Sequence, residues 1–150
     1  LVMSLPKDYP RKIDDIEKIS DALNCQVIEV FRGIDDFLAI VKDESIVETI
    51  EPNIEKIAEL DSRGLIVSAK GETTDFTSRV FGPNVGVDED PVTGSAHALL
   101  ATYWGDVLNL QKMKARQASK RGGELICEVL ENNVEITGKA KLYLQGEIYF

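Results

Sequence analysis

The residues best suited to chemistry lie between Gly86 and His97, where the chain reads GVDEDPVTGSAH. Asp90 precedes a proline, which disfavours helical backbone angles for the residue before it, so its carboxylate is held in an extended or turn conformation. Thr93, Gly94 and Ser95 follow, and these residue types favour a helix start, where free N–H groups and the helix dipole attract an anion. The segment therefore predicts an acid/base group beside an anion-binding site.

We accordingly predict Asp90 as catalytic residue and Thr93, Gly94, Ser95 and Ala96 as substrate-binding residues. A plainer interpretation of the same residues remains open. The acidic stretch 88–90 would also suit an exposed loop, and an ordinary capped helix would begin with the same residue types.

Four further residues are possible members of the site. His97, the only histidine, could carry a proton near neutral pH, although a hydrogen-bonded position on the helix is the preferred interpretation. Arg79 could clamp a carboxylate, and a salt bridge to the acidic turn is preferred for it. Gln117 and Ser119 belong to the stretch QASKRGG, which offers polar groups but would look the same as a bulged strand end.

The surrounding elements must open a cleft at this point. Residues 95–108 are apolar enough to form a buried helix, so the polar segment before it has to lie at the mouth of a cleft. Periodicity predicts shorter helices over 13–23, 45–50 and 52–60, and strands over 27–31, 37–41, 65–69, 76–81, 113–119, 124–130, 134–137 and 139–144. Asn132 and Asn133 suit a tight hairpin with positive φ angles. We expect an antiparallel or mixed curved sheet around the helix.

Composition limits the classes of partner. The 150 residues are 43% hydrophobic and carry a net charge of -9, which disfavours nucleic acid and anionic membranes. Cys25 and Cys127 lack metal-ligand spacing, so we expect two ordinary thiols and no metal site. No stretch has the length of a transmembrane helix or the pattern of a signal peptide, which favours the cytoplasm. The first residue is Leu, which suggests a piece of a longer protein.

Three linked motifs resemble the signature of the phenazine-biosynthesis PhzF-like isomerase family. They are SRVFGP at 78–83, GVDEDPVTGSAH at 86–97 and QASKRGG at 117–123. Residues 33–38 and 60–64 are similar to the segments that lead into the second half of that family. The resemblance covers nearly the whole chain but only about the second half of the family's length.

The resemblance implies an α+β, diaminopimelate-epimerase-like fold, in which two similar halves enclose the active site and each wraps a sheet around a central helix. It also implies cofactor-independent proton transfer on a small carboxylate-bearing metabolite, with no bound cofactor and often in a homodimer. Asp90 and Ser95 match the family's site-lining Asp and Ser. Epimerases of this fold place a cysteine near this point, and the lack of one here disfavours two-thiol racemisation.

The family's first half, with its Gly-Asn-Pro segment and principal acid/base Glu, is not among these residues. We therefore predict a connecting segment and helix over 1–24 and the C-terminal epimerase-like domain over 25–150. The domain would pair with an N-terminal half or form a homodimer, and the isolated chain would be inactive. The alternative is a non-catalytic half-domain that binds a partner chain or a ligand. A hydrolase using Ser95 is disfavoured because the chain lacks a GxSxG elbow there.

Overall fold

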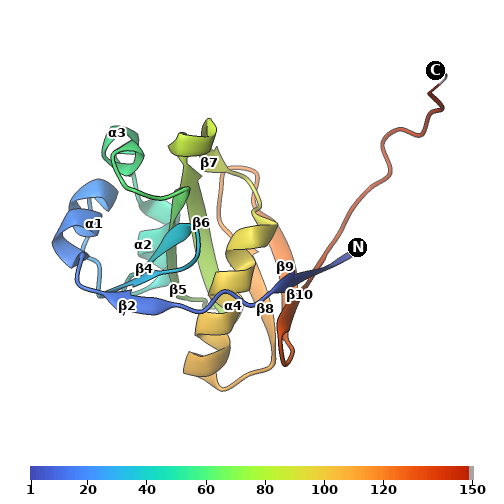
Figure 1. The fold of residues 1–150 in the computed structure, drawn as a ribbon, viewed down its shortest axis with the longest axis horizontal. Helices are drawn as coiled ribbons and strands as arrows, with labels where there is room; N and C mark the ends of the chain where they lie inside the picture. The colour runs from blue at the N-terminus through green and yellow to red at the C-terminus, as the bar shows by residue number, and fades with distance from the viewer. Residues whose placement is uncertain (149–150) are drawn as a thin grey trace.

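Helix α4 (Gly94–Leu108) lies at the centre of the structure, and a ten-stranded sheet curves around it (Figure 1). The computed structural model describes residues 1–148. Along the sheet the strands run β1 (Val2–Pro6), β10 (Asn133–Gly138), β9 (Gly123–Val129), β8 (Lys112–Gln117), β6 (Phe76–Gly82), β5 (Gly64–Lys70), β4 (Asp36–Ile40), β3 (Glu29–Arg32) and β2 (Arg11–Ile13), while β7 (Val87–Asp90) pairs with β6.

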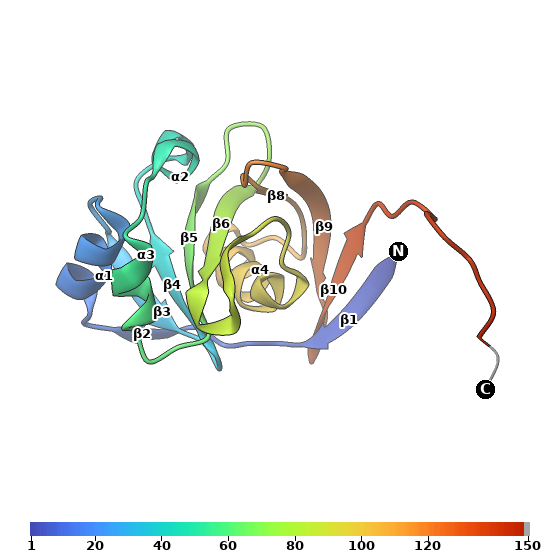
Figure 2. The same cartoon turned by 90° about the horizontal axis from the view of Figure 1, so that it is seen from above.

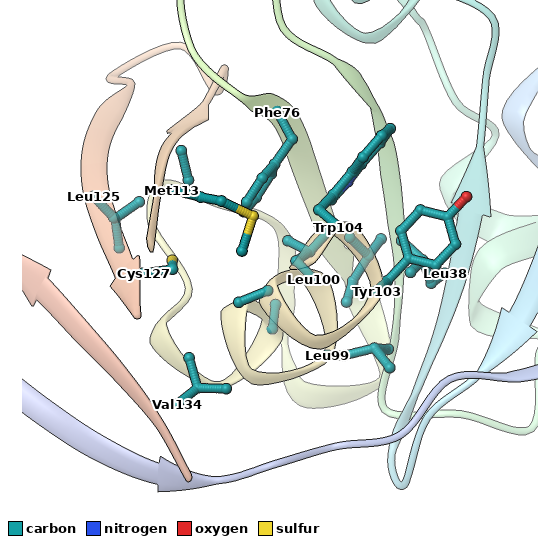
Figure 3. Packing of buried hydrophobic residues seen from close by; sticks show 14 of the residues in the cluster. Leu38, Phe76, Leu99, Leu100, Tyr103, Trp104, Met113, Leu125, Cys127 and Val134 are labelled. Carbon is teal, nitrogen blue, oxygen red and sulfur yellow. The ribbon is translucent and has the colours of Figure 1, made fainter. Parts of the chain in front are cut away.

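The sheet can wrap the helix because α4 is apolar on nearly all of its faces. A helix of that composition is stable only when it is buried all round, and every residue of α4 from Ala96 to Trp104 is buried. Figure 2 shows the strands curving around α4 when the molecule is seen from above. Figure 3 shows how Phe76 of β6 packs beside Trp104 of α4, with nearly parallel rings whose centroids are 6.1 Å apart.

A second apolar layer covers the other face of part of the sheet. Helices α1 (Ile16–Leu23), α2 (Glu44–Thr49) and α3 (Ile54–Ala58) pack there against residues such as Val30, Val67 and Phe81. Side chains cap the N-termini of two of these short helices: Asp43 accepts a hydrogen bond from Ile46 N, and Asn53 accepts one from Lys56 N. The sheet therefore has α4 on one face and three surface helices on part of the other.

Most of the expected elements are present, within a few residues of their predicted ends. Two neighbouring pairs, β4 with β5 and β6 with β8, are parallel, and the other pairs are antiparallel, so the sheet is mixed as expected. Strands β1, β2 and β7 were not expected from the sequence. Residues 1–24 thus supply two strands to the sheet and helix α1 to its outer layer, and the boundary at residue 24 stays a prediction.

Two local expectations are wrong. Residues 139–144 alternate like a strand, but they lie in no helix or strand, and the chain from 139 extends away from the sheet (Figure 1). A strand needs a neighbour to satisfy its backbone groups, and no strand among residues 1–148 pairs with this segment. The hairpin between β9 and β10 is present, but Asn132 and Asn133 are not among the described residues with positive φ.

Candidate active site

The acidic segment enters the site as a short strand that ends at Asp90. Strand β7 pairs with β6, with Asp90 opposite Val80. Pro91 has no N–H to donate, which ends the pairing and turns the chain toward α4. Thr93 then has extended backbone angles, φ -112 and ψ 103, and serves as the N-cap position of the helix.

Asp90 is joined to the helix start through Thr93. The Thr93 hydroxyl donates to Asp90 Oδ2 over 2.6 Å. Gln117 of β8 holds both residues, because its Oε1 accepts from Thr93 N at 2.8 Å and its Nε2 donates to Asp90 O at 2.7 Å. The carboxylate is therefore fixed in place at the mouth of the helix and does not point freely into solvent.

The first turn of α4 keeps its amides available. An N-cap threonine usually accepts a hydrogen bond from the helix with its hydroxyl, but here the hydroxyl serves Asp90 and makes no cap. The N–H groups of Gly94, Ser95 and Ala96 have no partner within the helix, since the first turn has no preceding carbonyls. They carry the positive end of the helix dipole. This helix start can accept an anion.

A pocket of about 200 Å³ opens beside these groups. Asp90, Thr93 and Ser95 line one part of it, and Arg63 and Asp36 line another. Arg63 Nε donates to Asp36 over 3.0 Å, and Arg63 Nη2 makes a second hydrogen bond to the same carboxylate. The rest of the wall consists of apolar side chains and two glycines: Gly64, Val80, Phe81, Gly82, Val85 and Val87.

The glycine at the helix start is tightly enclosed. A Cβ atom added to Gly94 would lie 2.4 Å from the terminal methyl of Met3 on β1. A side chain at position 94 would therefore require the flexible end of the Met3 side chain to move away from the helix start. Ala96, the other small residue predicted for binding, is packed in the core with no exposed surface, its amide included, and it does not line the pocket.

The other predicted residues lie around the pocket but do not line it. Arg79 donates to Glu89 over 2.6 Å and to the carbonyl of Ile50 over 2.7 Å, so it holds the acidic strand β7 against α2. Ser119 donates to the carbonyl of Pro91 over 2.7 Å. Both residues fix the segment that carries Asp90.

His97 is completely buried one turn into α4. Its Nδ1 lies 2.7 Å from the carbonyl oxygen of Thr93, and because a carbonyl only accepts, Nδ1 carries the proton. Its Nε2 is buried and has no hydrogen-bond partner among the described residues. Burial lowers the pKa of His97 to about 4. The ring is therefore neutral at physiological pH and supports the helix start from inside the core.

Comparison with known proteins places these observations in a family. A family model described as phenazine biosynthesis-like protein, PhzC-PhzF, matches residues 7–146. The chain belongs to the PhzC-PhzF family. An uncharacterised isomerase of Pseudomonas aeruginosa is 40% identical over 148 residues, which are 99% of this chain and 57% of that protein. A phenazine biosynthesis-like domain-containing protein of Homo sapiens is 35% identical over 169 residues, covering 99% of this chain and 58% of that protein.

Solved structures agree with the fold of this PhzC-PhzF chain. A crystal structure of a PhzF-family phenazine biosynthesis protein from Enterococcus faecalis has a TM-score of 0.91 and 42% identity, and the match covers 99% of this chain and 57% of that one. The diaminopimelate-epimerase-like fold expected from the sequence is thereby confirmed. The chain spans little more than half the length of the relatives that it matches.

Asp36 and Arg63 were missed as pocket residues of this family member. Asp36 begins β4, and Arg63 directly precedes β5. These two strands are parallel with Asp36 opposite Gly64, so their starting ends lie side by side and bring the two charges together. Recognition of a parallel pair in the sequence would have predicted this contact.

Among residues 1–148, no group of three or more His, Cys, Asp or Glu side chains is arranged to hold a metal ion. No helix in the same range is long and apolar enough to cross a membrane. Both cysteines are free, Cys25 half-buried and Cys127 buried, and neither lines the pocket.

Proposed function

We propose that this chain is the C-terminal part of a cofactor-independent isomerase or epimerase-like enzyme that moves a proton on a small carboxylate metabolite. One observation carries the proposal: a fixed carboxylate, Asp90, and the uncapped first turn of a 15-residue helix border the same pocket. Proton transfer beside a bound anion needs these two features together.

The helix start would hold the substrate carboxylate. The amides of Gly94 and Ser95 point out of the first turn, and two carboxylate oxygens can accept from both of them. The exposed Ser95 side chain lines the pocket and adds a hydroxyl donor. The apolar walls formed by Val80, Phe81 and Val87 suit a small carbon skeleton next to this carboxylate.

Asp90 would take or return a proton on that skeleton. A second acid/base group would act from the opposite side of the pocket, supplied by the part of the family's length that this chain does not span or by a second copy. A positioned acid/base group contributes about 10²–10⁴-fold to a rate. Closure of the opposite half would also exclude water from the carbanion-like intermediate.

A second candidate is a half-domain that binds a partner chain and catalyses nothing. Exposed apolar side chains in the extended C-terminal segment favour it, since Leu142, Tyr143 and Leu144 are 79%, 98% and 80% exposed. Large apolar groups of this kind often mark an interaction surface.

Binding of benzoate, a simple small carboxylate, tests the anion site. In a ¹⁵N NMR titration of the chain, benzoate should shift the amides of Gly94 and Ser95 first. Ser95→Ala should weaken binding about two- to tenfold, the loss expected for one hydrogen bond. Asp90→Asn should strengthen it because it removes a nearby negative charge.

Asp88→Asn is the matched control for Asp90→Asn. It removes the same charge from an exposed position two residues away and should leave the benzoate affinity almost unchanged. Amide shifts scattered over the surface, or equal affinities in all four proteins, would contradict the anion site.

Deuterium incorporation from D₂O into a carbon-bound position of a small carboxylate, measured on the native gene product, separates the enzyme from the partner-binding module.

A further inference from the structure

Gln117 is completely buried on β8, yet its side chain is devoted to the Asp90–Thr93 turn. Besides the bonds to Thr93 N and Asp90 O, its Nε2 lies 3.2 Å from Thr93 Oγ1. The orientation of the amide is fixed by its partners. Thr93 N–H can only donate and therefore faces Oε1, while Asp90 O can only accept and therefore faces Nε2.

This orientation sets the direction of the Thr93 hydroxyl. Because Oγ1 accepts from Gln117 Nε2, the hydroxyl proton remains free to donate to Asp90 Oδ2 at 2.6 Å. No hydrogen bond from the part of the chain that the structure describes reaches Asp90 Oδ1. The two oxygens of the carboxylate thus differ: Thr93 holds Oδ2, Oδ1 has no such bond, and Asp90 lines the pocket.

We propose that Gln117 is a positioning residue of the proton-transfer site. Gln117 orients the Thr93 hydroxyl, which binds Asp90 Oδ2, so that Asp90 contacts the substrate through Oδ1. This inference rests on the proposed function. A proton-transfer group misplaced by about 1 Å can lose roughly 100-fold in rate. A buried amide that cannot turn away is a suitable support for such a group.

The Gln117 side-chain amide makes one hydrogen bond more than are needed to fasten the turn to β8. The bonds to Thr93 N and Asp90 O would be enough to fasten the turn to β8. The bond to Thr93 Oγ1 adds no further backbone support, and its effect is on the direction of a hydroxyl. Ser119 offers the contrast, since it fastens the same turn through Pro91 O and reaches neither Thr93 nor the Asp90 side chain.

The test measures the Thr93 χ1 rotamer by three-bond NMR couplings in the ligand-free chain. The wild type and Ser119→Ala should each populate one rotamer. Gln117→Met, which has similar length and no amide, should populate two or more. A single rotamer in Gln117→Met would overturn the proposal. Equal averaging in Ser119→Ala would also overturn it, because the effect would then be a general loosening of the turn.

A wild-type measurement decides the matter if Gln117→Met does not fold. The Gln117 NH₂ protons should exchange slowly with water and show cross-peaks to Thr93, and free exchange would refute the proposal.

In the native gene product, Thr93→Val should lower deuterium incorporation about 100-fold with benzoate affinity within threefold of wild type, and Thr93→Ser should restore the rate. Parallel loss of rate and affinity in Thr93→Val would refute positioning. If the wild type neither binds benzoate nor exchanges deuterium, the proposed function fails, and the rotamer result still stands.

Discussion

Two threonine–carboxylate pairs in this protein share a geometry and differ in their surroundings. Thr93 donates to Asp90 at 2.6 Å beside the pocket, and Thr77 donates to Glu44 at 2.5 Å beneath α2. Glu44 is only 5% exposed, and both of its oxygens are used. Oε1 also accepts from Arg116 at 3.0 Å, and Oε2 accepts from the backbone of Glu72 at 2.7 Å.

The difference shows how a carboxylate that supports the fold can be told from one available for chemistry. Burial is the largest influence on Glu44 and opposes its ionisation, but the bonds from Thr77, Glu72 N and Arg116 together lower its pKa. A carboxylate saturated in this way has no oxygen left for a ligand. Asp90 lines a pocket, and among the described residues only Thr93 donates a hydrogen bond to its carboxylate, which distinguishes it from Glu44.

Removing the saturated carboxylate should have the largest effect on stability. Glu44→Ala removes three hydrogen bonds to a charged acceptor and leaves the Thr77 hydroxyl and the Glu72 N–H without it, so we expect a loss of about 3–5 kcal/mol in the free energy of unfolding. Urea denaturation measures this loss. Glu48→Ala is the control: it removes the other carboxylate bound to Arg116, but that side chain is 43% exposed, and the loss should be below about 1 kcal/mol.

Benzoate binding should remain unchanged in Glu44→Ala wherever the variant is folded, since Glu44 does not line the pocket. A small loss of stability, equal to that of Glu48→Ala, would mean that Glu44 is not a saturated support. A loss of benzoate affinity would mean that the two pairs are not independent.

The sequence predicted more of the fold than of the contacts within the site. The apolar run 95–108 was sufficient to predict a central helix, because burial on all faces requires a surrounding sheet. Asp90 and Ser95 could be selected because their local motif is contiguous, and both line the pocket. Asp36 and Arg63 lie 27 residues apart, and only the parallel pairing of β4 and β5 brings them together. The strand predicted over 139–144 was wrong for a related reason, because a strand depends on neighbouring strands that its own residues do not specify.

Lowering the pH should reduce the folding stability contributed by the regions around the two pairs over different pH ranges. His97, which holds the Thr93 carbonyl, has a native pKa of about 4 against about 6.5 when unfolded. The unfolded chain binds this proton first, so stability is full above pH 6.5 and falls by about 3 kcal/mol as the pH drops to 4. The pKa of Glu44 is lowered, so its contribution begins to fall only below its ordinary value of 4.5 and is lost as the pH passes its native pKa.

Urea denaturation of the wild type and His97→Asn at pH 7, 5.5 and 4 measures this difference. Asn can still donate to the Thr93 carbonyl but does not titrate, so the variant should show a smaller decrease between pH 6.5 and 4. Glu44→Gln should change only the decrease below pH 4.5. Equal slopes for the wild type and His97→Asn above pH 4.5 would contradict the burial of a neutral ring at this helix start.

The smallest effects should come from the two threonines, and they compare the pairs most directly. Thr77→Val and Thr93→Val each replace a hydroxyl by a methyl of similar size. Thr77→Val should lose about 1.5–3 kcal/mol of stability, because Glu44 then lacks a buried charge-assisted hydrogen bond that water cannot replace. Thr93→Val should lose less than about 1 kcal/mol, because water in the pocket can reach Asp90 in place of the hydroxyl. Equal losses by urea denaturation would show that Asp90 is as closed to solvent as Glu44, and an oxygen of Asp90 could not then be available to a substrate.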